Sequence, residues 1–331
     1  MSIFDINIKK KSYIIDNFDS SCLTLEIEGK DVNHIIINSI RKICINQIPI
    51  YALHRAKIKI LKNSSVFDST EMELRLSQLP IKRIEHDVKF LPTKYYKNVN
   101  FSDPKLERDF NDTFNIEFYL NVKNNGPEKT LYATTNNLRI SINDNIIESN
   151  KIYQGIEPIT LIMLRPGEEF EASMKAVLAV GELDSIFNAS NSYYEEITEN
   201  HYIFNIESKG QLSEFELLER GLEIIIEKLK IIKENLTQEN YFIMLQNSSS
   251  VKIEIANEDH TCGGPINNIL QNMEEVIFSG VSMLNFMEKK IILTLVVKKE
   301  YKCLEILNTA IDNTINLYEF IKKKIITLSK K

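Results

Sequence analysis

The sequence predicts an α+β fold in which two related strand–helix modules accompany a separate β-rich segment. Short segments that alternate apolar and polar residues, typical of half-buried strands, occur along the whole chain. Two long segments, at about residues 213–236 and 304–325, repeat apolar residues at helical spacing. The order strand, helix, strand, long helix occurs twice, so we expect two related halves.

The first half begins with a strand and a helix. Residues 22–28 alternate as a half-buried strand. A helix is predicted over residues 32–46, with Asp31 as its expected N-cap. Pro49 ends this helix, because the residue before a proline leaves the helical region. One stripe of the helix carries the apolar residues Ile36, Ile40 and Ile43.

A strand and a long helix complete the first half. The strand is predicted over residues 202–207 and the helix over 213–236, where Ser213 and Glu216 form a capping-box pattern. The helix has a coiled-coil-like seam at Leu218, Leu222, Ile225, Leu229 and Ile232. A seam of this regularity requires a partner helix.

The last quarter of the chain supplies that partner. Strands are predicted over 251–255 and 290–297, and a polar turn, Glu258–Gly263, leads into a short helix that ends near Asn272. The final helix carries Leu304, Leu307, Ile311, Ile315 (or Thr314), Tyr318, Ile321 and Ile325 on one stripe. We expect the two long stripes to pack against each other.

A β-rich insertion separates the parts of the first half. Asn-Asn, Gly-Pro and Pro-Gly turns divide short alternating segments such as Phe114–Leu120. The expected domains are a larger module from residues 1–97 and 201–245, the insertion over 98–200, and a smaller module over 246–331.

Composition restricts the classes of function. The chain has 331 residues, a formal charge of −6 and a pI of about 5.6, which disfavours broad nucleic-acid binding. The cationic end of the last helix, Lys322–Lys324, is interpreted as solvated. Four widely spaced cysteines, no leader and no long apolar run predict a soluble protein of a reducing, intracellular compartment. No membrane association is expected.

The turn at Glu258, Asp259 and His260 has two interpretations. With Cys262 as nucleophile it would resemble an acid–base site of an enzyme. Neighbouring residues on a turn point in different directions, however, so we favour polar groups that bond to free backbone N–H groups at a helix start. The glycines near Pro265 lack phosphate-loop spacing, and the five histidines lack metal-ligand spacing. We predict no catalytic residue, cofactor or metal.

A second polar cluster lies on the first helix. Asn38, Arg41 and Lys42 interrupt an otherwise apolar segment. A solvated helix face is the favoured interpretation from the residues alone, and a docking contact to another protein is the alternative.

Several segments resemble one known family. Asn38–Ala52 looks like the first helix of the amino-terminal domain of the bacterial RNA polymerase alpha subunit. It also resembles the archaeal D subunit and the third-largest subunit of RNA polymerase II. Three further segments resemble this family in the same order, namely Asn63–Ile81, Leu164–Glu168 and Phe204–Gly210. The insertion departs from the family because it lacks the Ala-Lys-Trp-Ser-Pro segment that many members carry.

The turn Glu258–Gly263 is similar to a signature of the family's smaller partner. That partner is the archaeal L subunit or the eleventh subunit of RNA polymerase II, normally a separate chain. Here segments that resemble both partners lie in one chain, which is similar to the fused subunits in polymerases of large cytoplasmic DNA viruses. Pro265 departs from the signature, and if Thr261 caps the helix, the helix is expected to start late or distort.

The resemblance implies a non-catalytic platform that assembles a DNA-dependent RNA polymerase. Expected partners are the largest and second-largest subunits and small subunits, with DNA only indirect and no homo-oligomer. A viral protein would act in the virion and host cytoplasm. The implied partner interface is Asn38, Arg41, Lys42, Glu258, Asp259 and His260. The expected intramolecular seam is Leu218, Leu222, Ile225, Leu229, Ile232, Leu307, Ile311, Tyr318 and Ile321.

Two other classes compete with this interpretation. One is an autonomous enzyme that uses the turn residues and Cys262, and the other is a DNA-binding transcription factor, which the acidic charge disfavours.

Overall fold

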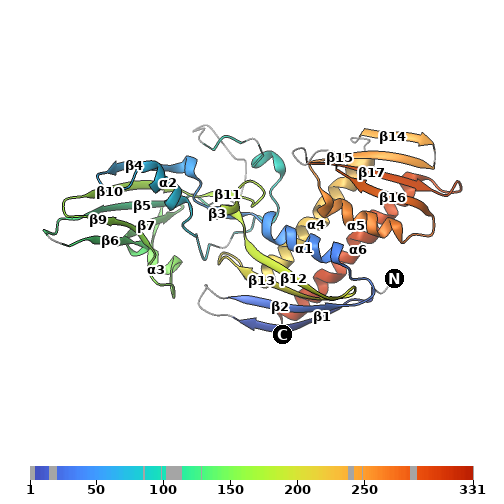
Figure 1. Ribbon diagram of the computed structural model, residues 1–331, viewed down its shortest axis with the longest axis horizontal. Coiled ribbons are helices and arrows are strands. Elements are labelled where there is room, and N and C mark those ends of the chain that lie inside the picture. Colours follow the sequence, from blue (N-terminus) through green and yellow to red (C-terminus); the bar gives the residue numbers. More distant parts are fainter. Residues whose placement is uncertain are drawn as a thin grey trace.

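The computed structural model shows a chain of two sheet-and-helix modules and a β-rich body (Figure 1). The structure describes the ranges 4–14, 21–84, 86–97, 99–101, 114–127, 129–237, 242–247, 249–283 and 289–330.

The first module is a four-stranded antiparallel sheet with two helices. Its strand order is β1-β2-β13-β12. The side chains of β2 alternate strictly between buried and half-buried, which is the period-two pattern of a sheet with one face on the core. The elements are β1 (Asn7–Ile14), β2 (Cys22–Glu28), α1 (His34–Asn46), β12 (Ser190–Thr198), β13 (His201–Ser208) and α4 (Glu214–Thr237).

The second module repeats this plan. Its strand order is β14-β15-β17-β16. Position by position, β14 corresponds to β1, β15 to β2, β17 to β13 and β16 to β12. The elements are β14 (Phe242–Asn247), β15 (Ser250–Ala256), α5 (His260–Gln271), β16 (Val276–Ser282), β17 (Lys290–Val297) and α6 (Cys303–Ser329). The predicted α+β fold and its internal repeat are therefore confirmed.

The β-rich body centres on a five-stranded sheet of order β4-β10-β5-β7-β8. Two strand pairs, β6 with β9 and β3 with β11, accompany it. Its strands are β3 (Ile50–Ala52), β4 (Ile58–Asn63), β5 (Ile116–Lys123), β6 (Leu131–Thr134), β7 (Leu138–Ile142), β8 (Asn145–Glu148), β9 (Thr160–Leu164), β10 (Glu169–Lys175) and β11 (Val177–Ala179). Its helices are α2 (Ser69–Ser77) and α3 (Ser149–Ile152). Short 3-10 helices lie at Arg55–Lys57, Thr93–Tyr95, Thr135–Asn137 and Ser185–Phe187.

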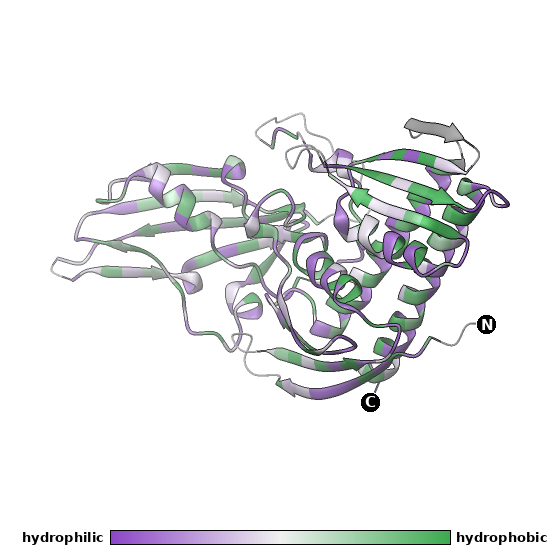
Figure 2. Ribbon diagram, turned by 45° about the vertical axis from the view of Figure 1, so that its right-hand side comes forward, coloured by the Kyte–Doolittle hydropathy of each residue, from purple (hydrophilic) through white to green (hydrophobic). Residues whose placement is uncertain are grey.

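Two large hydrophobic cores organise these parts. One continuous core joins both modules through α1, α4, α5 and α6, and a second fills the β-rich body. Along the strands, hydrophobic and hydrophilic residues alternate (Figure 2). Two observations bear on the predicted domain boundaries. Ile58 and Met72, which precede residue 98, belong to the second core, and β12, which precedes residue 200, pairs along its length with β13 of the first module. The domain boundaries at 98 and 200 remain a prediction, and residue 98 lies outside the described ranges.

Two expected helix starts need correction. Asn33, not Asp31, caps α1, and its side chain accepts a hydrogen bond from the Ile36 amide. The Asp31 carboxylate instead accepts the backbone N–H of Asp5 at 2.7 Å. The capping box of α4 is present, since the Ser213 amide donates to the Glu216 carboxylate at 2.9 Å.

The second correction concerns α5. Asp259 caps this helix, and Thr261 lies inside it. Pro265 therefore falls beyond the first turn, where it removes one backbone donor, and the helix continues through it to Gln271. Among the helices of the described ranges, none has the length and apolar character needed to cross a bilayer.

Candidate functional site

The two polar clusters predicted from the sequence lie on elements that pack together, since α1 contacts α5. Asn38, Arg41 and Lys42 are half-buried on α1. At the start of α5, Glu258 and Asp259 are half-buried and His260 is exposed. The fold thus brings together the helices that carry the two clusters, although these helices are far apart in sequence.

On α1, Asn38 holds the Arg41 side chain in place. Arg41 donates from Nε and from Nη2 to Oδ1 of Asn38, at 3.1 and 2.9 Å. The guanidinium fork is therefore oriented before any partner arrives. Such an oriented, always-charged group suits a protein contact.

Asp259 has a structural role at the start of α5. Its carboxylate accepts the backbone N–H of Thr261 at 2.7 Å. Burial alone would raise the pKa of Asp259, but the bonds from Thr261 and the nearby charges of Lys42 and Lys289 hold it below its usual value. Lys42 thus acts electrostatically on the turn of the other module.

Glu258 forms a buried ion pair that the sequence analysis missed. Its carboxylate lies 3.2 Å from Nζ of Lys228 on α4, with side chains 15% and 12% exposed. Burial would lower the pKa of Lys228, but the Glu258 carboxylate acts together with smaller effects of Cys262, Tyr96 and Glu182, and the net result is a raised pKa. No local pattern predicts this pair, since its members belong to different modules.

Further polar contacts surround this pair. Lys289 of the second module pairs with Glu182 at 2.8 Å, and Gln47 of α1 donates to the same carboxylate at 2.6 Å. Lys97 donates to the side chain of Asn257 at 2.9 Å. The cavity among these groups has a volume of about 10 Å³, which is room for one water molecule and not for a substrate.

The Cys262 thiol does not suit nucleophilic catalysis. It is 1% exposed, and burial raises its pKa well above the usual value. The thiolate is the nucleophilic form, so a buried thiol of raised pKa is unreactive. In the described ranges, no group of three or more His, Cys, Asp or Glu residues is arranged to hold a metal ion.

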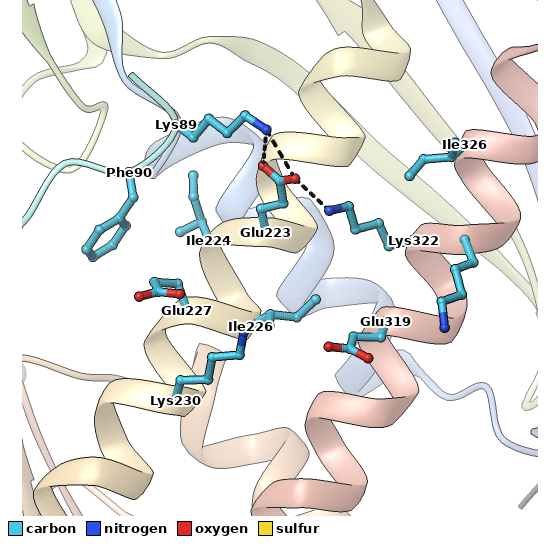
Figure 3. Close-up of a pocket in the computed structure, with 11 residues that line it drawn as sticks. Lys89, Phe90, Glu223, Ile224, Ile226, Glu227, Lys230, Glu319, Lys322 and Ile326 are labelled. Carbon is cyan, nitrogen blue, oxygen red and sulfur yellow. Dashed lines mark hydrogen bonds and ion pairs between the residues drawn. The ribbon is translucent and has the colours of Figure 1, made fainter. Parts of the chain in front are cut away.

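The expected seam residues share one core. Each of the nine is at most 2% exposed, and α4 packs along α6. Glu223 lies between Lys89 and Lys322 at one edge of this packing (Figure 3). Lys322 was expected to be solvated, but it is half-buried and pairs with Glu223 at 2.5 Å, because α4 runs beside the end of α6.

Comparisons with known proteins agree with the two-module arrangement. The RNA polymerase Rpb3/Rpb11 dimerisation domain matches twice, over residues 26–229 and over residues 250–324. A DNA-directed RNA polymerase subunit of Acanthamoeba polyphaga mimivirus is 28% identical over 321 residues, covering 90% of this chain and 88% of the relative. The archaeal subunit Rpo3 of Methanocaldococcus jannaschii is 24% identical over 191 residues, covering 58% and 79%.

Proposed function

The chain belongs to the RNA polymerase Rpb3/Rpb11 dimerisation family, and from this membership we infer that it is a non-catalytic assembly subunit of a DNA-directed RNA polymerase. The observation that carries this function is the presence of two family modules in one chain, packed through a common core. In this arrangement, a pair of subunits is replaced by one polypeptide.

Joining the modules favours their association. A short connection between α4 and β14 makes pairing an intramolecular step with a high effective concentration. We therefore propose a folded monomer in which each module already has its complement. Other polymerase subunits are its partners, and we propose that these include the largest and second-largest subunits and small subunits.

We propose that Asn38, Arg41 and Lys42 contact the second-largest subunit. The support is geometric, since the Arg41 side chain is oriented by Asn38 and remains half-exposed. His260, which is exposed at the start of α5, is proposed to extend this contact. Glu258 and Asp259 support the contact indirectly, by fixing the turn that carries His260.

The location of the protein follows from the same proposal. Its relative in a virus suggests a transcription machinery of the virion and the host cytoplasm. The partner complex would contact DNA, and this chain would do so only indirectly.

Affinity purification from the native source tests the proposed function. We expect two very large subunits to be recovered with the chain, together with template-dependent nucleotide polymerisation. A tagged chain recovered without large subunits would contradict the platform. A chain that hydrolyses a substrate alone, or that binds duplex DNA in a salt-sensitive way, would instead favour one of the competing classes.

A further inference from the structure

The two long helices carry the same charges at the same positions. When α4 and α6 are aligned at their first residues, Glu223 falls on Asp312 and Lys233 falls on Lys322. Each acid pairs with the lysine of the other helix, Glu223 with Lys322 at 2.5 Å and Lys233 with Asp312 at 2.6 Å. The two ion pairs are thus related by the internal repeat.

Most of the apolar seam obeys the same alignment, and Ile225, which falls on the buried Thr314, is an exception. Five buried positions of α4 fall on buried positions of α6, namely Leu218 on Leu307, Leu222 on Ile311, Leu229 on Tyr318, Ile232 on Ile321 and Leu236 on Ile325. A surface with this symmetry is self-complementary. A similar seam with both ion pairs could therefore form between two copies of the same module.

The most buried ion pair breaks the symmetry. Lys228 of α4 falls on Leu317 of α6. When α1 and α5 are aligned at their N-caps, Glu258 falls on Val32. The module junction therefore has an ion pair on one side, whereas the equivalent positions on the other side are Leu317 and Val32, each 1% exposed.

We propose that the buried pair Lys228–Glu258 makes the pairing of the modules heterotypic. If two first modules paired with the same geometry, Lys228 would face Val32 of the other copy. If two second modules paired, Glu258 would face Leu317. A buried charge without an opposite partner is strongly unfavourable, so both like pairings are rejected.

The partner of the first module is thereby defined by its chemistry. The first module accepts a sheet-and-helix module that places a carboxylate just before the N-cap of its short helix. It rejects a copy of itself, which has an apolar residue there. This is specificity through a penalty on the wrong complex, in addition to attraction in the right one.

A second crossing ion pair does not carry the selectivity to the same degree. Lys289 of the second module also pairs with Glu182, which follows β11, but their side chains are 34% and 15% exposed. A pair that keeps contact with water loses less when its partner is missing. Lys228 and Glu258 are the least exposed ion pair in the described part of the chain.

A double-mutant cycle in the full chain tests the coupling of the two residues. Lys228→Leu and Glu258→Val copy the apolar residues of the other side. Each single change leaves one buried charge unpaired and is expected to lower the midpoint of thermal unfolding by on the order of 10 °C. The double change is expected to restore the midpoint to within a few degrees. A double variant as unstable as the worse single variant would refute the coupling.

Selectivity is tested by co-expressing two differently tagged copies of the same full-length variant. Capture through one tag then reports how much of the other copy has paired with it. We expect little cross-capture for the unmodified chain and at least about tenfold more for the Lys228→Leu/Glu258→Val variant. The variant no longer buries an unpaired charge when like modules pair, and a gain of about 1.4 kcal/mol raises the pairing constant tenfold. The increase would come from pairing of like modules across two chains.

Two matched variants separate charge from other causes. Lys233→Leu/Asp312→Leu removes an ion pair related by the repeat, so cross-capture should stay at the unmodified level. Lys228→Glu/Glu258→Lys restores opposite charges and should return cross-capture to that level. Equal cross-capture in the apolar variant and the unmodified chain would overturn the proposal, as would an equal increase in the Lys233 control. None of these readouts depends on binding to a polymerase.

Discussion

The thiol of Cys44 on α1 occupies the space in which a side chain of residue Gly221 on α4 would lie. A Cβ atom placed on Gly221 would be 2.9 Å from Sγ of Cys44, closer than such atoms approach. Glycine inside a helix is unfavourable by about 1 kcal/mol relative to alanine. What glycine provides here is the close approach of α1 and α4 in the first module.

Gly221→Ala is therefore expected to destabilise the protein despite the higher helix propensity of alanine. Overpacking lowers the free energy of unfolding by about 1–3 kcal/mol. The higher helix propensity of alanine offsets about 1 kcal/mol of this loss. Urea unfolding at neutral pH measures the change. Combining Gly221→Ala with Cys44→Ala removes the obstructing sulfur, so the alanine should then be tolerated. An equal loss in both backgrounds would show that the clash is not the cause.

Arg41→Glu is expected to weaken assembly while leaving the isolated chain folded. The reversed charge would face whatever acidic or polar surface the guanidinium contacts, so recovery of the large subunits should fall by about tenfold or more. Co-purification measures this recovery, and thermal unfolding of the isolated variant checks the fold. Arg139→Glu, at an exposed arginine of the β-rich body, is the matched control. Unaltered recovery with Arg41→Glu would remove α1 from the proposed interface.

Local sequence patterns predicted the helices and strands well, because their periodicity reflects burial directly. The seam of α4 illustrates this, since Leu222 and Leu229 are fully buried. Caps were predicted less well. Asp31 and Asn33 are both good capping residues, but Asp31 accepts a distant bond from the Asp5 amide and Asn33 caps the helix.

The polar contacts between modules could not be predicted. Lys228 lies on a helix with many other lysines, and only the packing of the two modules brings Glu258 to it. The same is true of Lys322 at the end of α6, because only the packing of α4 beside that end brings Glu223 to it. Contacts of this kind depend on tertiary geometry, for which one sequence carries no local signal.

His86 should make stability depend on pH. Its imidazole is 2% exposed, and Nε2 lies 3.1 Å from the Pro49 carbonyl oxygen. Burial, with a smaller effect from the Arg220 guanidinium, lowers the pKa of His86 to about 4. Because the folded pKa lies below the unfolded value near 6.5, its contribution is complete above pH 6.5 and is lost as the pH falls towards 4.

The expected loss from His86 between pH 7 and pH 4 is about 2–3 kcal/mol. Urea unfolding across this range measures it, with His86→Gln as the comparison, since glutamine does not titrate. Carboxylates contribute equally to both proteins, so the difference between the two curves isolates the imidazole. If the stabilities of the two proteins changed with pH in parallel, the pKa of His86 would not be lowered in the folded state, and the prediction would be wrong.

The cysteines should differ widely in reactivity. Cys22 is half-buried, whereas Cys44, Cys262 and Cys303 are buried, and burial raises the pKa of Cys44 to about 12. At about pH 8, iodoacetamide is expected to label Cys22 first, and Cys44 and Cys262 a hundredfold or more slowly. Mass spectrometry of native and urea-unfolded protein measures the order. Rapid labelling of Cys262 in the native protein would revive the enzyme interpretation.

The short connection between α4, which ends at Thr237, and β14, which begins at Phe242, has a consequence for supply. One messenger RNA yields both modules in a fixed one-to-one ratio, so neither accumulates as an orphan for proteases to remove. Their union is a first-order reaction, whose half-time is the same in a dilute and in a concentrated compartment. The number of platforms therefore follows the number of translated chains, with no second gene product to keep in balance.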